Sequence, residues 1–245
     1  LGRIHDRKDF LESFENARQE GFQNINVDLM SGIPLQTLSS YERTLRETAQ
    51  LEPEHISAYS LIVEEGTVFA KDPELEQLLP SESDDVKMYE MTGEILEDYG
   101  YHKYEISNYA KEGMECRHNL GYWSQVPYLG VGLSSSSYLD GKRFCQTRSM
   151  DKYLGQKDFQ KEYHITERQT EQEEMEEFMF LGLRKTKGVS EVDFQERFGK
   201  SMDSIYGNVI QEAVQNEFLK REKDNILLTE HGILFSNQVL CDFLL

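Results

Sequence analysis

A histidine, an asparagine, a tyrosine and a tryptophan stand close together in the segment "RHNLGYW", residues 117–123. The pattern predicts a helix over 114–124, which would place His118 beside Tyr122 and Asn119 beside Trp123, since side chains four residues apart are neighbours on a helix. A histidine nitrogen can ligate haem iron, and tyrosine and tryptophan rings stack on flat ring systems. The spacing equally fits an amphipathic helix whose aromatic rings are core and whose histidine is hydrogen-bonded to a carbonyl.

Other residues could bind a polar ligand. Asp28 lies toward the end of the alternating segment "NINVDLM". An ionised carboxylate near the end of a strand could accept hydrogen bonds from hydroxyl or ammonium groups. It could also simply cap the next turn. Arg3 could hold a carboxylate by two parallel hydrogen bonds, or be a surface arginine. Glu105 and Asn108 in "YEISNYA" are a weak signal on their own.

The cysteines form no recognisable metal or disulfide framework. Cys116, Cys145 and Cys241 are 145 − 116 = 29 and 241 − 145 = 96 positions apart, so neither a C-x2-C nor a C-x3-C-x2-C arrangement occurs. The sequence also contains no Walker A, dinucleotide-binding or nucleophile-elbow motif. An odd, scattered set of thiols fits a reducing, cytoplasmic compartment better than an oxidising one.

The charge of the chain excludes several classes of partner. It has 45 acidic and 26 basic residues, a net charge of −19, which argues against non-specific binding to nucleic acid or to anionic membranes. The sequence contains no run of 18 apolar residues that could span a membrane, and we expect no signal peptide. Hydrophobic residues make up 38% of the chain, enough for a packed core, and the length suits one large domain or a large and a small one.

The elements that must position these residues alternate in type over the first half of the chain. We expect a parallel sheet flanked by helices, because helices and strands joined by short connections build βα units. Chemistry in such sheets belongs at the carboxyl ends of the strands. The predicted helices are 8–20, 38–50 and 84–100, and the predicted strands are 24–30, 55–62 and 101–107.

The second half of the chain has a different pattern. Asp140-Gly141 is typical of a tight turn between two strands. Beyond about residue 166, helices are predicted at 171–184, 190–198 and 201–217, followed by a two-stranded wing around Asp224-Asn225 and a final helix. This is a winged-helix pattern, and the acidic charge favours a cap or interaction role over DNA binding. We therefore predict two domains, 1–150 and 166–245.

Several long segments occur in an order that resembles one known family. They include "NINVDLMSGIPLQT", "HISAYSLIVEEGTVF", "YEISNYAKEGMECRHNLGYW" and "FMFLGLRKTKGVS". The chain is similar to the oxygen-independent coproporphyrinogen III oxidase family of radical S-adenosylmethionine proteins, from its first residue to about 190 and more loosely to its end. The resemblance implies an α/β fold: the later part of a partial (β/α)6 barrel, followed by a mainly helical, winged-helix-like C-terminal domain.

The resemblance also assigns expected binding residues. Arg3 and Asp28 match family positions that contact S-adenosylmethionine, and Ile62 falls where the family lines the adenosyl pocket. The string "HNLGYW" resembles the H-N-x-x-Y-W haem-binding signature of the HemW-type haem chaperone branch. It implies that haem is bound with the help of His118, Asn119, Tyr122 and Trp123, with His118 as a candidate iron ligand.

Two functions follow from the resemblance. The favoured one is a haem chaperone that binds haem and delivers it to acceptor haemoproteins. The alternative is the oxidative decarboxylation of coproporphyrinogen III to protoporphyrinogen IX, so whether the protein is an enzyme stays open. Expected partners are haem or a porphyrinogen and haemoprotein acceptors, with membrane contact only through an acceptor and no nucleic acid. The expected oligomeric state is a monomer or a haem-induced dimer.

The chain departs from the family pattern in one respect. The C-x3-C-x2-C motif that holds the family's [4Fe–4S] cluster, and the glycine-rich strand that follows it, are not in this sequence, which starts at Leu1. We therefore expect an N-terminally truncated chain whose cluster ligands lie in the missing part. A third reading is that the chain has no activity on its own.

Overall fold

The structure is a computed structural model that describes residues 3–67, 69–155 and 164–245. The chain divides into two compact units, Leu1–Cys116 and Arg117–Leu245, which we call the N-terminal unit and the C-terminal unit. These units describe how the chain packs, and the domain limits expected from the sequence, 1–150 and 166–245, stay a prediction.

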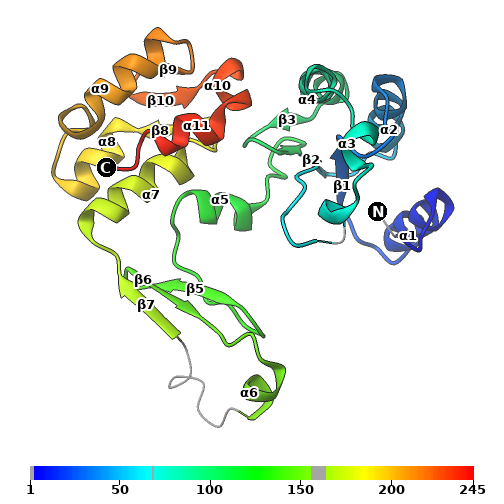
Figure 1. The fold of residues 1–245 in the computed structure, drawn as a ribbon, viewed down its shortest axis with the longest axis horizontal. Helices are drawn as coiled ribbons and strands as arrows, with labels where there is room; N and C mark the ends of the chain where they lie inside the picture. The colour runs from blue at the N-terminus through cyan, green and yellow to red at the C-terminus, as the bar shows by residue number, and fades with distance from the viewer. Residues whose placement is uncertain (1–2, 68, 156–163) are drawn as a thin grey trace. The chain divides into compact units, whose positions relative to one another are not determined.

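The N-terminal unit contains a four-stranded sheet with the strand order β1-β2-β4-β3. The first two strands are parallel, with Asn26 opposite His55 and Ser31 opposite Ser60. The predicted helices and the first two predicted strands are confirmed with small shifts at their ends (Figure 1). Their bounds are α1 Arg7–Gln19, β1 Asn26–Ser31, α2 Leu38–Gln50, β2 His55–Ser60 and α4 Glu82–Asp98. Between β2 and α4 lie the short η1 Phe69–Lys71 and α3 Leu75–Leu78.

The predicted third strand is wrong in extent, and the expectation of a wholly parallel sheet is wrong because an additional antiparallel strand follows it. In place of a strand over 101–107, the chain forms β3 His102–Lys103, a turn, and β4 Asn108–Ala110. Strand β4 runs antiparallel to both β2 and β3. The turn is fixed from within, because the buried Glu105 carboxylate accepts hydrogen bonds from the backbone N–H of Ser107 and from the Asn108 side chain.

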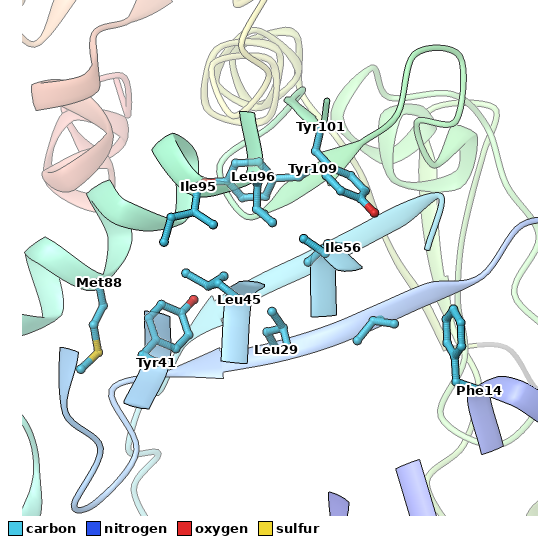
Figure 2. Packing of buried hydrophobic residues seen from close by; sticks show 12 residues of the cluster. Phe14, Leu29, Tyr41, Leu45, Ile56, Met88, Ile95, Leu96, Tyr101 and Tyr109 are labelled. Atoms are coloured by element: carbon cyan, nitrogen blue, oxygen red, sulfur yellow. The ribbon is translucent and has the colours of Figure 1, made fainter. Parts of the chain in front are cut away.

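One apolar core joins the sheet of the N-terminal unit to its helices. Strand β1 alternates, with Val27 and Leu29 buried and Asn26, Asp28 and Met30 exposed. Since alternate side chains point to opposite faces of a strand, one face is apolar and the other is polar. Figure 2 shows the apolar face packed against side chains of the helices; the labelled residues are Phe14, Leu29, Tyr41, Leu45, Ile56, Met88, Ile95, Leu96, Tyr101 and Tyr109.

The C-terminal unit begins with the short helix α5, Arg117–Trp123. A three-stranded antiparallel sheet follows, with β6 between its two neighbours. The predicted turn at Asp140-Gly141 is confirmed: both residues have positive φ, 52° and 67°, as the common two-residue hairpin turn requires. The bounds are β5 Ser136–Leu139, β6 Lys142–Cys145, α6 Met150–Gly155 and β7 His164–Arg168.

The rest of the C-terminal unit is a set of helices with a small sheet of order β8-β10-β9 (Figure 1). The predicted wing is the antiparallel pair of β9 and β10. The predicted final helix is two helices that meet at Phe235, whose backbone is not helical. The bounds are α7 Glu171–Gly182, β8 Val189–Ser190, α8 Glu191–Phe198, α9 Met202–Gln215, β9 Leu219–Glu222, β10 Asn225–Leu228, α10 Glu230–Leu234 and α11 Ser236–Cys241.

Strand β8 approaches β10 closely at Gly188. A Cβ atom added there would lie 2.0 Å from the carbonyl oxygen of Ile226, and the backbone φ is +65°. Both facts require glycine, because other residues rarely adopt this conformation and their Cβ would clash. In the described part of the chain, no helix combines the length and the apolar character needed to cross a membrane.

Candidate functional site

The polar face of the N-terminal sheet carries side chains from three strands. Asn26 lies opposite His55, and Asp28 lies opposite Ser57; Ser57 in turn lies opposite Asn108. Residues paired across neighbouring strands project to the same face. The helices pack on the other face, so these five side chains form one surface that the helices do not cover.

The His55 side chain on this polar face is fixed by hydrogen bonds at both of its ring nitrogens. Its side chain is buried, with Nδ1 2.6 Å from the Oδ1 atom of Asn26 and Nε2 2.8 Å from the hydroxyl of Tyr104. The Asn26 amide is oriented by its own bond, since its Nδ2 donates to Asp28. Its Oδ1 must therefore accept, which makes His55 Nδ1 the donor and leaves Nε2 to accept from Tyr104.

The charge state of His55 agrees with these contacts. Burial lowers the pKa of the imidazole, and the nearby Asp28 carboxylate offsets part of this effect. A neutral ring needs one donor and one acceptor nitrogen, as found here. His55 is therefore a fixed, uncharged part of the sheet, and no sequence pattern singled it out.

Asp28 is exposed, and its position in the strand differs from the prediction. It is the third residue of β1 and not at its carboxyl end, because the strand continues through Met30 to the buried Ser31. One carboxylate oxygen of Asp28 accepts a 2.8 Å hydrogen bond from Asn26. The carboxylate thus remains available on the polar face, away from the strand ends where we expected it.

The carboxyl ends of β1 and β2 carry other polar groups. The hydroxyls of Ser31 and Ser60 lie 3.1 Å apart. Asp85 of α4 lies close to the turn after β1, since its Oδ1 would be 3.0 Å from a Cβ added at Gly32. Burial raises the pKa of Asp85, and the Ser60 hydroxyl offsets part of this effect. Within the described residues, Oδ1 of Asp85 is buried without a hydrogen-bond partner. The sequence did not point to this carboxyl, because it sits at the beginning of a helix with other acids.

The other two residues expected to contact S-adenosylmethionine are exposed. Arg3 precedes α1, and Ile62 follows β2 with 72% of its side chain exposed. In the portion of the chain that is described, no hydrogen bond or ion pair joins Arg3 to Asp28. The structure does not bring these residues into contact with one another, and their roles stay a prediction.

Asn108 and Glu105 form a buried pair next to this surface. They are 3% and 1% exposed, and the Asn108 amide donates a 2.5 Å hydrogen bond to the Glu105 carboxylate. The Oδ1 atom of Asn108 has no partner among the described residues. A buried acceptor without a donor is unusual in a folded protein, so the polar face offers one unfilled hydrogen-bonding position.

In the C-terminal unit, helix α5 brings together two of the residues expected to bind haem. The rings of His118 and Tyr122 meet edge to face with centroids 4.4 Å apart. Tyr122 meets Tyr128 in the same way at 4.7 Å. The predicted neighbourhood of His118 and Tyr122 is confirmed, although the helix covers 117–123 and not 114–124. Tyr128 was not anticipated, because it lies beyond the helix.

Trp123 and Asn119 complete the segment, and both are half-buried. The guanidinium carbon of Arg184 lies 4.7 Å from the centroid of the Trp123 ring, in the range of a cation–π contact. The indole Nε1 is buried and has no acceptor among the described residues. The ring face of Trp123 thus contacts Arg184, while its Nε1 donates no hydrogen bond to any described residue.

A hydrogen-bond network fixes the chain directly after Trp123. Gln125 has a left-handed backbone with φ 53°. Its amide donates to Glu177 of α7 and accepts from Arg197 of α8. Arg143 of β6 holds the same Glu177 carboxylate through two nitrogens, at 3.1 and 2.7 Å. The end of α5 is therefore tied to two helices and to the hairpin.

The described residues do not fit a metal cluster. Where side chains are placed, no group of three histidine, cysteine, aspartate or glutamate residues could hold a metal ion. Cys116 and Cys145 are half-buried and Cys241 is exposed. We therefore derive no chemistry from a cluster.

Comparison with known proteins supplies the family. Residues 169–235 match the family model described as the HemN C-terminal domain. Over its whole length the chain is 41% identical to the heme chaperone HemW of Bacillus subtilis (strain 168), of which it covers 65%. The chain is therefore similar to HemW proteins over its whole length and carries a segment that matches the HemN C-terminal domain. It is also 35% identical to the heme chaperone HemW of Lactococcus lactis, again covering 65% of that protein.

A solved structure supports the fold of this HemN and HemW relative. The chain superposes on the coproporphyrinogen III oxidase HemN of Escherichia coli, described as a radical SAM enzyme, with a TM-score of 0.80 and 18% identity. The match covers all of this chain and 60% of HemN. The predicted α/β fold class is confirmed, and the similarity to HemN and HemW proteins agrees with the resemblance found in the sequence. The chain spans about 65% of the length of the two HemW proteins named above.

Proposed function

We propose that this protein is a haem chaperone that binds haem at α5 and delivers it to acceptor haemoproteins. The observation that carries the proposal is the His118–Tyr122 pair, in which an exposed imidazole is braced by an aromatic ring. An exposed histidine with a fixed ring plane is suited to ligate haem iron. The similarity to HemW proteins over the whole chain supports the same function.

The residues around His118 supply a suitable surface for a flat, apolar ligand. Tyr122 and Tyr128 extend the aromatic series away from the imidazole. In the loop after α5, three apolar side chains are exposed: Val126 by 51%, Leu129 by 64% and Val131 by 83%. Exposed apolar groups gathered in one loop favour a binding role. In this proposal His118 ligates the iron, and Asn119, Tyr122 and Trp123 hold the macrocycle or its edge.

A second part of the proposal concerns S-adenosylmethionine. Asp28 is exposed on the polar face, and the unfilled acceptor of Asn108 lies on the same face with Ser57 between the two residues. Together they suit a ligand that carries amino and hydroxyl groups. We assign Arg3 to the carboxylate of that ligand and Ile62 to its adenosyl group. When bound, this cofactor and the family's [4Fe–4S] cluster would supply radical chemistry. The described residues offer no ligand set for the cluster, so no step is assigned to it.

The oxidase alternative has weaker support. Its basis here is the superposition on HemN at 18% identity, and a likeness at that level concerns the fold alone. Haem delivery to haemoproteins in the cytoplasm, by a monomer or a haem-induced dimer, is the more economical proposal for a chain whose binding residues lie on an exposed helix.

A haem titration followed by the Soret band tests the proposal. We expect His118→Ala to weaken haem binding at least about tenfold, or about 1.4 kcal/mol, through loss of the iron ligand. The matched control is His5→Ala, which removes another exposed histidine and should leave the affinity unchanged. Transfer of haem from the loaded protein to an apo-globin then tests release. Equal affinities for wild type, His118→Ala and Trp123→Ala would contradict the proposal.

A further inference from the structure

A small cavity lies at the end of α5 in the C-terminal unit. Its volume is about 260 Å³. Its polar lining comes from four places in the chain: Trp123, Ser124 and Gln125; Lys185 and Lys187; Ser190 and Asp193; and Asn225. This volume is below the roughly 300–1,000 Å³ of sites that enclose drug-sized ligands. The cavity can therefore take a small group, and not a whole tetrapyrrole.

The lining offers hydrogen-bond donors that the protein leaves partly unused. The indole Nε1 of Trp123 can only donate, and it is buried without an acceptor among the described residues. The ammonium of Lys185 makes one hydrogen bond in the described structure, to the hydroxyl of Ser124 at 3.3 Å. An ammonium group has three donors, so Lys185 can make further bonds.

The local charge is the reverse of that of the whole chain. Lys185 and Lys187 against Asp193 give +2 − 1 = +1 in the lining, while the chain carries −19. Arg184, over the ring of Trp123, adds positive charge nearby. Burial lowers the pKa of Lys185, Asp193 raises it and Lys187 lowers it. A partly desolvated ammonium is stabilised by an anion that enters the cavity.

We propose that this cavity binds a single carboxylate group, which accepts hydrogen bonds from Trp123 Nε1 and from Lys185 Nζ. A carboxylate matches the site because it has two acceptor oxygens and one negative charge. The source that we favour is a propionate side chain of haem, since Trp123 belongs to the segment proposed to bind haem. This choice of source rests on the proposed function, whereas the carboxylate site itself does not. A free small carboxylate is the other source.

The chain contains its own reporter for the first experiment, because Trp123 is its only tryptophan. We expect sodium propionate to change the Trp123 fluorescence in a saturable way, and the uncharged propionamide to have no effect. Lys185→Gln should abolish the response, and Lys185→Arg should retain most of it. The matched control is Lys152→Gln, which removes an exposed lysine of α6 and should respond like wild type.

A second experiment identifies the source by comparing haem with its dimethyl ester in Soret titrations. If a propionate is bound, the ester should bind at least about tenfold more weakly to wild type. Lys185→Gln should weaken haem by a similar factor and leave the ester unchanged, as expected for a coupled pair. Haem and its ester could instead bind equally well while propionate still gives a response that depends on Lys185. The carboxylate site would then stand, and its ligand would be a free small carboxylate.

The outcomes separate this inference from the proposed function. If haem fails to bind while propionate perturbs Trp123 through Lys185, the chaperone proposal fails and the carboxylate site stands. If propionate leaves the Trp123 fluorescence unchanged, and Lys185→Gln binds haem and its ester as wild type does, the carboxylate site is overturned. Circular dichroism of each variant ensures that only folded protein is compared.

Discussion

The two units hold two histidines in opposite ways. His55 is 5% exposed, both of its ring nitrogens are hydrogen-bonded, and burial lowers its pKa. His118 is exposed and is held by the edge of one tyrosine ring. A histidine whose nitrogens are both satisfied stabilises the fold, whereas one held only through its ring can still use a nitrogen on a ligand. The surroundings, and not the residue type, separate the two roles.

The largest expected effect is on the free energy of unfolding, and it contrasts the packed core next to His55 with the exposed loop near His118. Ile56→Ala removes a completely buried side chain and should lower the free energy of unfolding by about 2–5 kcal/mol, because it leaves a cavity. Leu129→Ala, at a position that is 64% exposed, should change it by less than about 0.5 kcal/mol. Urea denaturation followed by circular dichroism measures both, and similar losses would contradict the contrast.

A somewhat smaller loss is expected from His55 itself. His55→Leu fills similar space but removes the two hydrogen bonds of the imidazole, to Asn26 and to the Tyr104 hydroxyl. Each such bond contributes about 0.5–1.5 kcal/mol, so the free energy of unfolding should fall by about 1–3 kcal/mol. His118→Leu is the matched control and should be close to neutral. Comparable destabilisation by the two variants would mean that His118 is a structural residue.

The aromatic brace of His118 should have a smaller effect, on affinity and not on folding. Tyr122→Leu removes edge-to-face contacts with His118 and Tyr128, and such pairs contribute about 0.5–1.5 kcal/mol. Haem binding followed by the Soret band should weaken about twofold to tenfold, while Tyr122→Phe keeps the ring and should behave as wild type. Unchanged haem affinity in Tyr122→Leu would show that the contact between Tyr122 and His118 does not contribute to haem binding.

The smallest effect is a dependence of stability on pH. The pKa of His55 is lowered in the folded state, whereas the unfolded chain takes up this proton near pH 6.5. Below that pH the unfolded state binds more protons, so the contribution of His55 is full above about pH 6.5 and is lost as the pH falls. The difference in unfolding free energy between wild type and His55→Leu should shrink from pH 8 to pH 5. A constant difference would show that His55 gains its proton without cost.

Much of the fold could be predicted from local patterns, because a helix or strand buries one side and its periodicity is written in consecutive residues. This is why α1, α2, α4 and the pair of β1 and β2 were expected close to their positions. The direction of β4 could not be predicted, since it depends on the turn that the buried Glu105 holds through Ser107 and Asn108. Local sequence does not reveal which strand a segment will pair with.

The candidate site was predictable to the same limited degree. His118 and Tyr122 are four residues apart, so a helix alone brings them together. Tyr128, Arg184 and Lys185 reach the same segment from a loop and from the end of α7, and their contacts depend on tertiary packing. The sequence also could not tell that Asp28 lies within its strand, because strand ends depend on the partner strand.

The close approach at Gly188 limits which sequences this unit can tolerate. Gly188 lines the proposed carboxylate cavity. The backbone of Ile226 in β10 lies so close to it that there is no room even for a methyl group. Any side chain at position 188 would meet the backbone of Ile226 and force the strands apart, which would disturb the lining of the cavity. In a library of all single substitutions, we expect every replacement of Gly188 to destabilise the fold. Replacements of Lys185 and Lys187 should leave the fold intact. Selection for a stable fold would then be enough to keep the glycine that shapes the cavity. Selection for binding a carboxylate would act on the lysines that give the cavity its positive charge.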